Sequence, residues 1–114
     1  MQRRDRIAIE KIISELQIGM DMMNGVTQEA FMQNEMLKRA VCMTTINVGE
    51  LVKNISDETR LAYPAVEWKA VAGMRDLAAH KYQTLRMEDV YWVCQSDFPT
   101  LKRQLRQILA DEQP

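Results

Sequence analysis

The sequence predicts an all-α protein, with residues 1–114 forming a single domain built as an antiparallel bundle of four or five helices. Apolar residues recur at spacings of three and four along most of the chain, and no segment alternates as a strand would. Only four glycines and three prolines interrupt this pattern. The 46% of hydrophobic and 27% of charged residues are typical of a compact domain of this length with one modest core.

The first helix is expected over residues 4–23, where six apolar residues keep helical spacing: Ile9, Ile12, Ile13, Leu16, Met20 and Met23. The turn residues of "NGVT" end this helix, and Thr27 can cap a new turn. A stripe of apolar residues from Leu37 to Ile55 predicts a second, longer helix, which the segment "NISDETRLAYP" ends. The chain has nine methionines, and we interpret those along the stripes as core filler.

The second half of the chain predicts two further helices. Pro64 keeps Tyr63 out of helical geometry, and a third helix follows, marked by Ala70, Val71, Met74, Leu77 and Ala78. After a short segment over about residues 87–94, Ser96 can cap a last helix that has Pro99 in its first turn. The buried face of this helix is marked by Leu101, Leu105, Ile108 and Leu109. Short connections between these helices favour antiparallel neighbours.

Charge and cysteine content exclude several classes of function. The net charge is −1 and the isoelectric point about 5.8, so a dedicated DNA-binding protein is not expected. No apolar run approaches the roughly 18 residues of a membrane span, and the N-terminal segment does not resemble a signal peptide, so we expect a cytoplasmic protein without membrane contact. Cys42 and Cys94, with one histidine, cannot form a four-ligand zinc site, so we expect buried cysteines and neither a metal nor a cofactor.

The segment "GMRDLAAHKY" on the third helix groups residue types that can act on phosphate. At about 100° per residue, Arg75 and Tyr82 fall on one flank of the helix, and Asp76 and His80 on the other. Asp76 precedes His80 by four residues, so its carboxylate could accept a hydrogen bond from the imidazole and raise its basicity. Spacing alone is more typical of an ordinary solvated helix surface.

Metal-free cleavage of RNA by its 2′-hydroxyl needs a base, an acid and a cation that steadies the charged phosphorane. One histidine per chain cannot fill both proton roles at once, and Arg75 and His80 diverge on a single helix. A two-fold homodimer would bring two copies of each residue around one groove. In the second helix Gly49 costs about 1 kcal/mol relative to alanine, which favours a close helix approach there, with Glu50 as a buried or cleft carboxylate.

The segment "MRDLAAHKY" resembles the signature of the HepT-like proteins of the HEPN superfamily, in which an arginine, four residues, a histidine, one residue and a tyrosine follow one another. The segments "NVGELVKNIS", "YPAVEWKAVAGMRD" and "DFPTLKRQL" are similar to further parts of that family, so the resemblance extends over nearly the whole chain. Asp76 stands where the family often has asparagine, and this carboxylate could alter the pKa of the histidine.

This resemblance implies a HEPN-like helical bundle and a homodimeric, metal-independent endoribonuclease. Such proteins are toxins of type VII toxin–antitoxin systems and pair with a small nucleotidyltransferase antitoxin. The implied roles are Arg75 and His80 as the catalytic pair, Asp76 as the polar residue that orients them, and Tyr82 as the hydroxyl that receives AMP from the antitoxin. RNA would be the substrate. The alternative is a non-catalytic subunit that docks the nucleotidyltransferase and serves as its substrate.

Overall fold

The computed structural model describes the backbone of residues 1–80 and 86–112, and the side chains of residues 1–76 and 86–112. Every regular element within these ranges is helical, which confirms the predicted all-α class. The four longer helices are α1 (Arg3–Met22), α3 (Glu35–Lys53), α5 (Trp68–His80) and α7 (Phe98–Asp111). Three short helices join them: α2 (Gln28–Met32), α4 (Asp57–Ala62) and α6 (Met87–Trp92).

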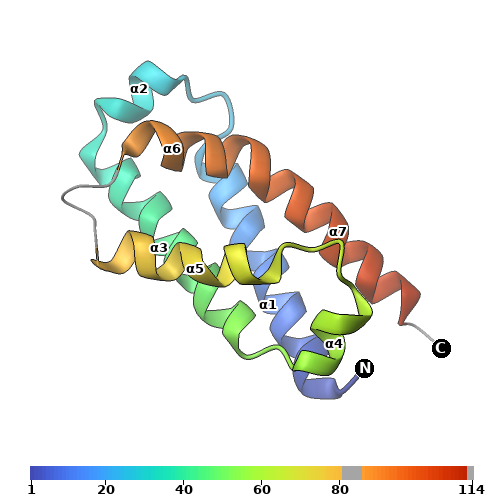
Figure 1. The fold of residues 1–114 in the computed structure, drawn as a ribbon. Coiled ribbons are helices and arrows are strands. Elements are labelled where there is room, and N and C mark those ends of the chain that lie inside the picture. The colour runs from blue at the N-terminus through green and yellow to red at the C-terminus, as the bar shows by residue number, and fades with distance from the viewer. Residues whose placement is uncertain (81–85, 113–114) are drawn as a thin grey trace.

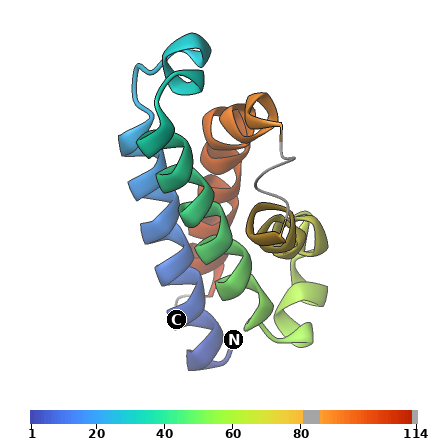
Figure 2. The same ribbon diagram turned by 90° about the vertical axis from the view of Figure 1, so that its left-hand side faces the viewer.

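Helices α1 and α3 lie side by side and form one layer of the molecule (Figure 2). They run antiparallel, because Asn47 near the end of α3 donates to Glu15 in α1, and Arg4 at the start of α1 donates to the carbonyl of Asn54. On the other side of this layer, α5 crosses α3 and α7 packs along α1 (Figures 1 and 2). The helix that carries the candidate motif is therefore held mainly by α3.

The core forms where the apolar stripes of these helices meet. Four residues of the predicted α1 stripe have no exposed surface: Ile9, Ile12, Leu16 and Met23. Phe31, Phe98 and Leu105 are also fully or almost fully buried, and they come from α2 and α7. The interpretation of the methionines as core filler is wrong for Met36 and Met43 of α3, whose relative exposures are 81% and 56%.

The starts of α2 and α3 follow the expected capping chemistry. The side chain of Thr27 accepts a hydrogen bond from the Ala30 amide, as predicted, and it caps the short helix α2. The chain then turns, and Asn34 caps α3 by accepting from the Leu37 amide. Asn and Thr are preferred here because a short side-chain oxygen can reach an amide of the first turn that has no partner within the helix.

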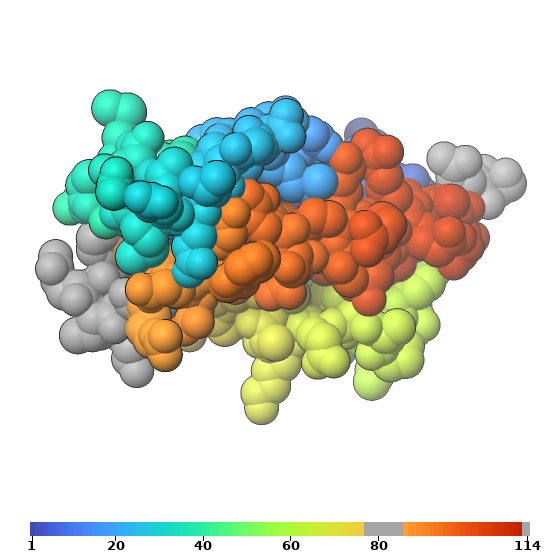
Figure 3. Space-filling view, turned by 90° about the horizontal axis from the view of Figure 1, so that it is seen from above, coloured from blue at the N-terminus to red at the C-terminus, as the bar shows by residue number. Residues whose placement is uncertain are grey.

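The junction between α6 and α7 differs from the prediction. Ser96 does not cap a new helix, because a π-helical turn over Val93–Asp97 joins α6 directly to α7. Pro99 has no amide hydrogen and its ring would clash with the carbonyl four residues earlier in an α-helix. A wider π-turn immediately before the proline relieves this conflict without ending the helix. Figure 3 shows α6 and α7 as one continuous ridge, with α2 against α6.

Helix α4 forms within the segment that the sequence predicts only as a helix stop, and a buried carboxylate holds its first turn. Asp5 of α1 has no exposed surface and accepts hydrogen bonds from the Ser56 amide at 3.0 Å, the Ser56 hydroxyl at 2.5 Å and the Thr59 hydroxyl at 2.6 Å. Burial by itself would raise the pKa of Asp5, but these hydrogen bonds and the nearby Arg4 outweigh it, and the pKa lies below its ordinary value.

Asp5→Asn is expected to lower the free energy of unfolding by about 2–3 kcal/mol at pH 7, because an amide cannot accept from all three donors. A depressed pKa means that the carboxylate stabilises the fold above its unfolded pKa, and that this stability is lost as the pH falls through the folded pKa. The difference between wild type and Asp5→Asn should therefore shrink in acid. Urea unfolding between pH 7 and pH 3 measures this, with Asp21→Asn on the surface of α1 as the control. A difference that does not change with pH would contradict this role for Asp5.

Candidate functional site

The candidate site is built where α5 crosses α3 at Gly49. A Cβ atom added at Gly49 would lie 2.6 Å from the Cβ of Arg75, 2.9 Å from its backbone nitrogen and 3.2 Å from the carbonyl oxygen of Ala72. Contacts this short to backbone atoms leave room for glycine alone, so the close helix approach predicted from the sequence is confirmed. The approach places the start of the Arg75 side chain directly on the surface of α3.

Two carboxylates hold the guanidinium of Arg75. Its Nε forms an ion pair with Glu50, the residue after Gly49 on α3. Its Nη1 donates to Oδ1 of Asp76 at 2.8 Å, and the Nζ of Lys53 lies 3.7 Å from the same oxygen. The four side chains form a cluster with two positive and two negative charges, which we call the Arg75 cluster.

The Arg75 cluster is open to solvent. The side chain of Arg75 is 33% exposed, and those of Glu50 and Asp76 are 49% and 57% exposed. The hydrogen bond to Asp76 and the charge of Glu50 raise the pKa of Arg75 above its ordinary value, so the guanidinium stays charged at every physiological pH. At this exposure the ion pairs contribute little stability, and their main effect is to fix the direction of the arginine.

A groove between α1 and α3, lined mainly by residues with polar ends, adjoins the cluster. It encloses about 490 Å³ and is lined by Lys11, Ser14, Glu15, Asn47, Glu50 and Leu51. Glu50 thus contributes both to this groove and to the Arg75 cluster. Sequence reasoning identified Glu50 as a buried or cleft carboxylate, and the structure places it at the edge of a cleft but not in the interior.

The structure describes only part of the predicted motif. His80 is the last residue of α5, and its backbone lies five residues after Arg75 on the same helix. The side chain of His80 and the whole of Tyr82 lie outside the described residues. Asp76 precedes His80 by one helical turn, so the hydrogen bond expected between these two side chains remains a prediction.

Arg75 and Asp76 are predicted on different flanks of α5, and their side chains nevertheless meet, because Nη1 of Arg75 donates to Oδ1 of Asp76. The sequence analysis also did not identify Lys53. The sequence spacing could have indicated Lys53, since it follows Glu50 by three residues and therefore lies on the same face of α3.

Both cysteines are buried, as predicted, with relative exposures of 4% for Cys42 and 1% for Cys94. Burial raises the pKa of Cys94 to about 12 and also raises that of Cys42, so both thiols stay protonated at neutral pH. Over the ranges that the structure describes, no group of three or more His, Cys, Asp and Glu side chains is placed to hold a metal ion. No helix in the same ranges is long and apolar enough to cross a bilayer.

The fold and the site define a small all-helical protein with a solvent-exposed arginine cluster on the helix that also carries its single histidine. The family described as Ribonuclease HepT-like matches residues 8–108. The chain belongs to this family of ribonucleases, which supports a ribonuclease function of the toxin type.

Named relatives share most of their length with this chain. The "Putative RNase TTE0752" of Caldanaerobacter subterraneus subsp. tengcongensis is 31% identical over 104 residues, which are 91% of this chain and 93% of the relative. The "Putative RNase MJ0125" of Methanocaldococcus jannaschii is 29% identical over 112 residues and 97% of each chain. The "Probable ribonuclease HepT" of Thermococcus cleftensis is 24% identical, covering 90% of this chain and 93% of its own. No solved structure matches the chain significantly.

Proposed function

We propose that this protein is a metal-independent endoribonuclease that acts in the cytoplasm as the toxin of a type VII toxin–antitoxin pair. The observation that carries this proposal is the geometry of Arg75, which two carboxylates hold at the surface on the helix that also bears His80. Membership of a ribonuclease family agrees with it.

The reaction is attack of a ribose 2′-oxygen on the adjacent phosphorus, with cleavage of the bond from phosphorus to the 5′-oxygen. One copy of His80, with a neutral imidazole, takes the proton of the 2′-hydroxyl. A second copy, with a protonated imidazole, gives a proton to the leaving 5′-oxygen. Asp76 orients the imidazole by accepting a hydrogen bond from it. The products are a 2′,3′-cyclic phosphate and a 5′-hydroxyl.

Arg75 stabilises the negative charge that grows on the phosphorane oxygens. A guanidinium has five N–H donors, and the contacts to Glu50 and Asp76 use Nε and one N–H of Nη1. Both N–H groups of Nη2 and one of Nη1 can then face a phosphate. Glu50 acts as a positioning residue, because it fixes Nε and so directs the remaining donors.

Two proton transfers with one histidine per chain favour a homodimer in which two copies of His80 share one groove. The outer face of the α1 and α3 layer is a suitable contact surface. Four exposed apolar side chains lie on these two helices: Ile7, Ile18, Met36 and Met43. The groove on this layer carries both Lys11 and Glu15, so a two-fold partner could pair opposite charges across it.

The experiment that tests this function is cleavage of a fluorescent RNA by the purified chain in excess EDTA. We expect cleavage to continue in EDTA and the products to end in 2′,3′-cyclic phosphates. An activity that disappears in EDTA and returns with a divalent cation would contradict the metal-independent mechanism.

We propose Tyr82 as the residue that a nucleotidyltransferase antitoxin modifies with AMP. Each added AMP would place a negative charge and an adenosine two residues from His80, and so would oppose the entry of RNA. Incubation with the antitoxin, ATP and magnesium should raise the intact mass by one or more AMP units, mapped to the peptide that contains Tyr82. Tyr82→Phe should keep its nuclease activity and gain no mass, with Tyr63→Phe as the control. An unchanged wild-type mass would contradict neutralisation by AMP transfer.

The alternative function, a non-catalytic subunit that docks the nucleotidyltransferase, has one observation in its favour. Asp76 gives Arg75 a second carboxylate, and an RNA phosphate must compete with it for the guanidinium. Under this alternative the purified chain would not cleave RNA, while Tyr82 would still receive AMP. The two assays together therefore separate the two functions.

A further inference from the structure

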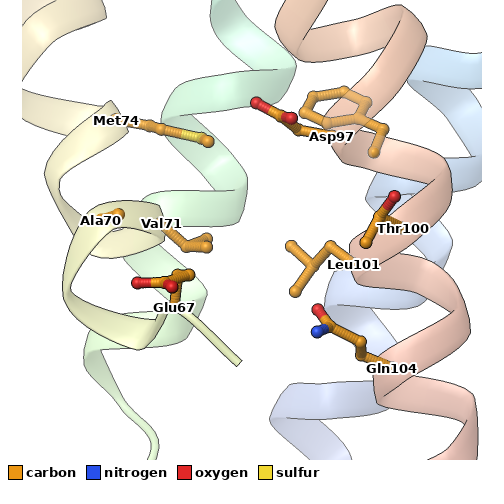
Figure 4. A pocket seen from close by; sticks show the side chains of 9 residues that line it. Glu67, Ala70, Val71, Met74, Asp97, Thr100, Leu101 and Gln104 are labelled. Atoms are coloured by element: carbon orange, nitrogen blue, oxygen red, sulfur yellow. The ribbon is translucent and has the colours of Figure 1, made fainter. Parts of the chain in front are cut away.

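A second groove lies between α5 and α7. Figure 4 shows Val71 and Met74 of α5 and Leu101 of α7 directed toward the space between the two helices. This cavity encloses about 270 Å³. The sequence analysis assigned no role to these positions beyond the core.

The groove continues along α7 past Gln104. A further cavity of about 390 Å³ lies between α7 and residues 62–66, and Gln104 lines both cavities. The side-chain amide of Gln104 donates to the carbonyl of Ala65, which also lines the second cavity, at 3.2 Å. One stripe of the chain runs beneath the whole groove: Asp97, Leu101, Gln104, Ile108 and Asp111. This heptad-like spacing usually marks a helix face that packs against another helix.

The charged residues that line this groove, among those that the structure describes, all carry negative charge. Three carboxylates line the two cavities, namely Glu67, Asp97 and Asp111, and no described lysine or arginine does. Within the described residues, Glu67 and Asp97 take part in no ion pair, and Asp111 accepts a hydrogen bond from Gln107. Arg103, on the neighbouring face of α7, donates to Thr100.

We infer that this groove binds an amphipathic helix of a partner protein whose apolar side chains are flanked by lysine or arginine. The length of α7, 14 residues, corresponds to about 20 Å, which matches a partner helix of three to four turns. Aliphatic side chains at helical spacing would enter the two cavities, and basic side chains would meet Glu67, Asp97 and Asp111. The bound helix would lie against α5 beside Met74, the residue that precedes Arg75.

A second copy of the chain fits this groove less well. Symmetric packing of groove on groove would place carboxylates against carboxylates, which costs binding energy. The face proposed for the homodimer also lies on the other side of the molecule, on the α1 and α3 layer (Figure 2).

The test uses two fluorescent 14-residue probe peptides with leucines at heptad spacing, one with lysine and one with glutamate at the remaining positions. Wild type should bind the lysine peptide at least about tenfold more tightly in anisotropy titrations. Ala70→Trp, which fills the groove, should remove this binding. Glu67→Lys combined with Asp97→Lys, both at exposed positions, should reverse the preference between the peptides.

The matched control is Glu10→Lys combined with Glu29→Lys, which changes the net charge equally at exposed positions on α1 and α2. Equal binding of the two peptides to wild type, or an equal loss in the control, would overturn the inference. If light scattering gave a lower molar mass for Ala70→Trp than for wild type, the inference would also be overturned, because the groove would then hold a second copy of the chain. None of these assays contains RNA, so an inactive nuclease would not affect their outcome.

Discussion

His80→Ala and Arg75→Ala are each expected to lower the rate of RNA cleavage by about 10²–10⁴-fold, the range typical of losing a general acid–base group or a preorganised charge. Arg75→Ala keeps the Cβ atom that packs against Gly49, and the remaining carboxylates of Glu50 and Asp76 are already solvated. Its free energy of unfolding should therefore change by only about 0.5 kcal/mol. Single-turnover cleavage of RNA and urea unfolding measure the two quantities.

Two further variants test whether the loss of cleavage rate is specific to Arg75 and its contact with Glu50. Arg103→Ala removes an exposed arginine from α7 and should keep full activity. Glu50→Gln leaves Arg75 charged but weakens its hold on Nε, so the rate constant should fall while substrate binding changes little. If Arg103→Ala and Arg75→Ala lowered the rate equally, the arginines would act only through general attraction to RNA, and the catalytic role of Arg75 would be wrong.

The homodimer proposed above, in which two copies of His80 share one groove, predicts the activity of a dimer that has only one His80. A heterodimer of wild-type and His80→Ala subunits, isolated with two different affinity tags, would contain one histidine where two are needed. Its activity should be far below half that of the wild-type dimer. An activity of one half would mean that each subunit cleaves RNA independently, and a single subunit mass on light scattering would exclude the dimer itself.

Gly49→Ala is expected to damage both the stability and the activity of the protein. The new Cβ atom would overlap the backbone of Arg75 and Ala72, so α5 must move away from α3. Overpacking of this kind costs about 1–3 kcal/mol of unfolding free energy. The movement also separates Arg75 from Glu50, and a displacement of about 1 Å in a catalytic group can lower the rate by about 100-fold.

Gly73→Ala provides the matched control for this substitution. Gly73 lies on the exposed side of α5, and among the described residues no atom outside its own stretch of helix lies within 4 Å of the position where a Cβ would be added. The same change should therefore stabilise the protein by about 1 kcal/mol, because alanine favours the helix. Thermal unfolding and RNA cleavage of both variants check the pair. Equal stability of Gly49→Ala and Gly73→Ala would show that the α3 and α5 crossing tolerates a wider separation.

Local sequence determined the helices and the most informative positions within them. The apolar periodicity of α1, the cap at Thr27 and the close approach at Gly49 depend on backbone geometry and on residues a few positions apart, so they could be predicted. The same is true of the placement of Arg75, Asp76 and His80 on one helix. The predicted cap at Ser96 was wrong because Pro99 favours a π-turn there, and α4 was not predicted because the distant carboxylate of Asp5 holds its first turn.

Only the tertiary structure decided which groups meet. The pairing of Arg75 with Glu50 joins residues 25 positions apart, and the hydrogen bond from the Ser56 amide at the start of α4 to Asp5 joins residues 51 positions apart. Both separations are far longer than the repeat of a helix. The acidic groove between α5 and α7 likewise depends on the distance between two helices that pack on different partners, α3 and α1. Helix periodicity specifies which side of a helix is apolar, but the packing of the whole core sets how closely two helices approach and which side chains remain between them.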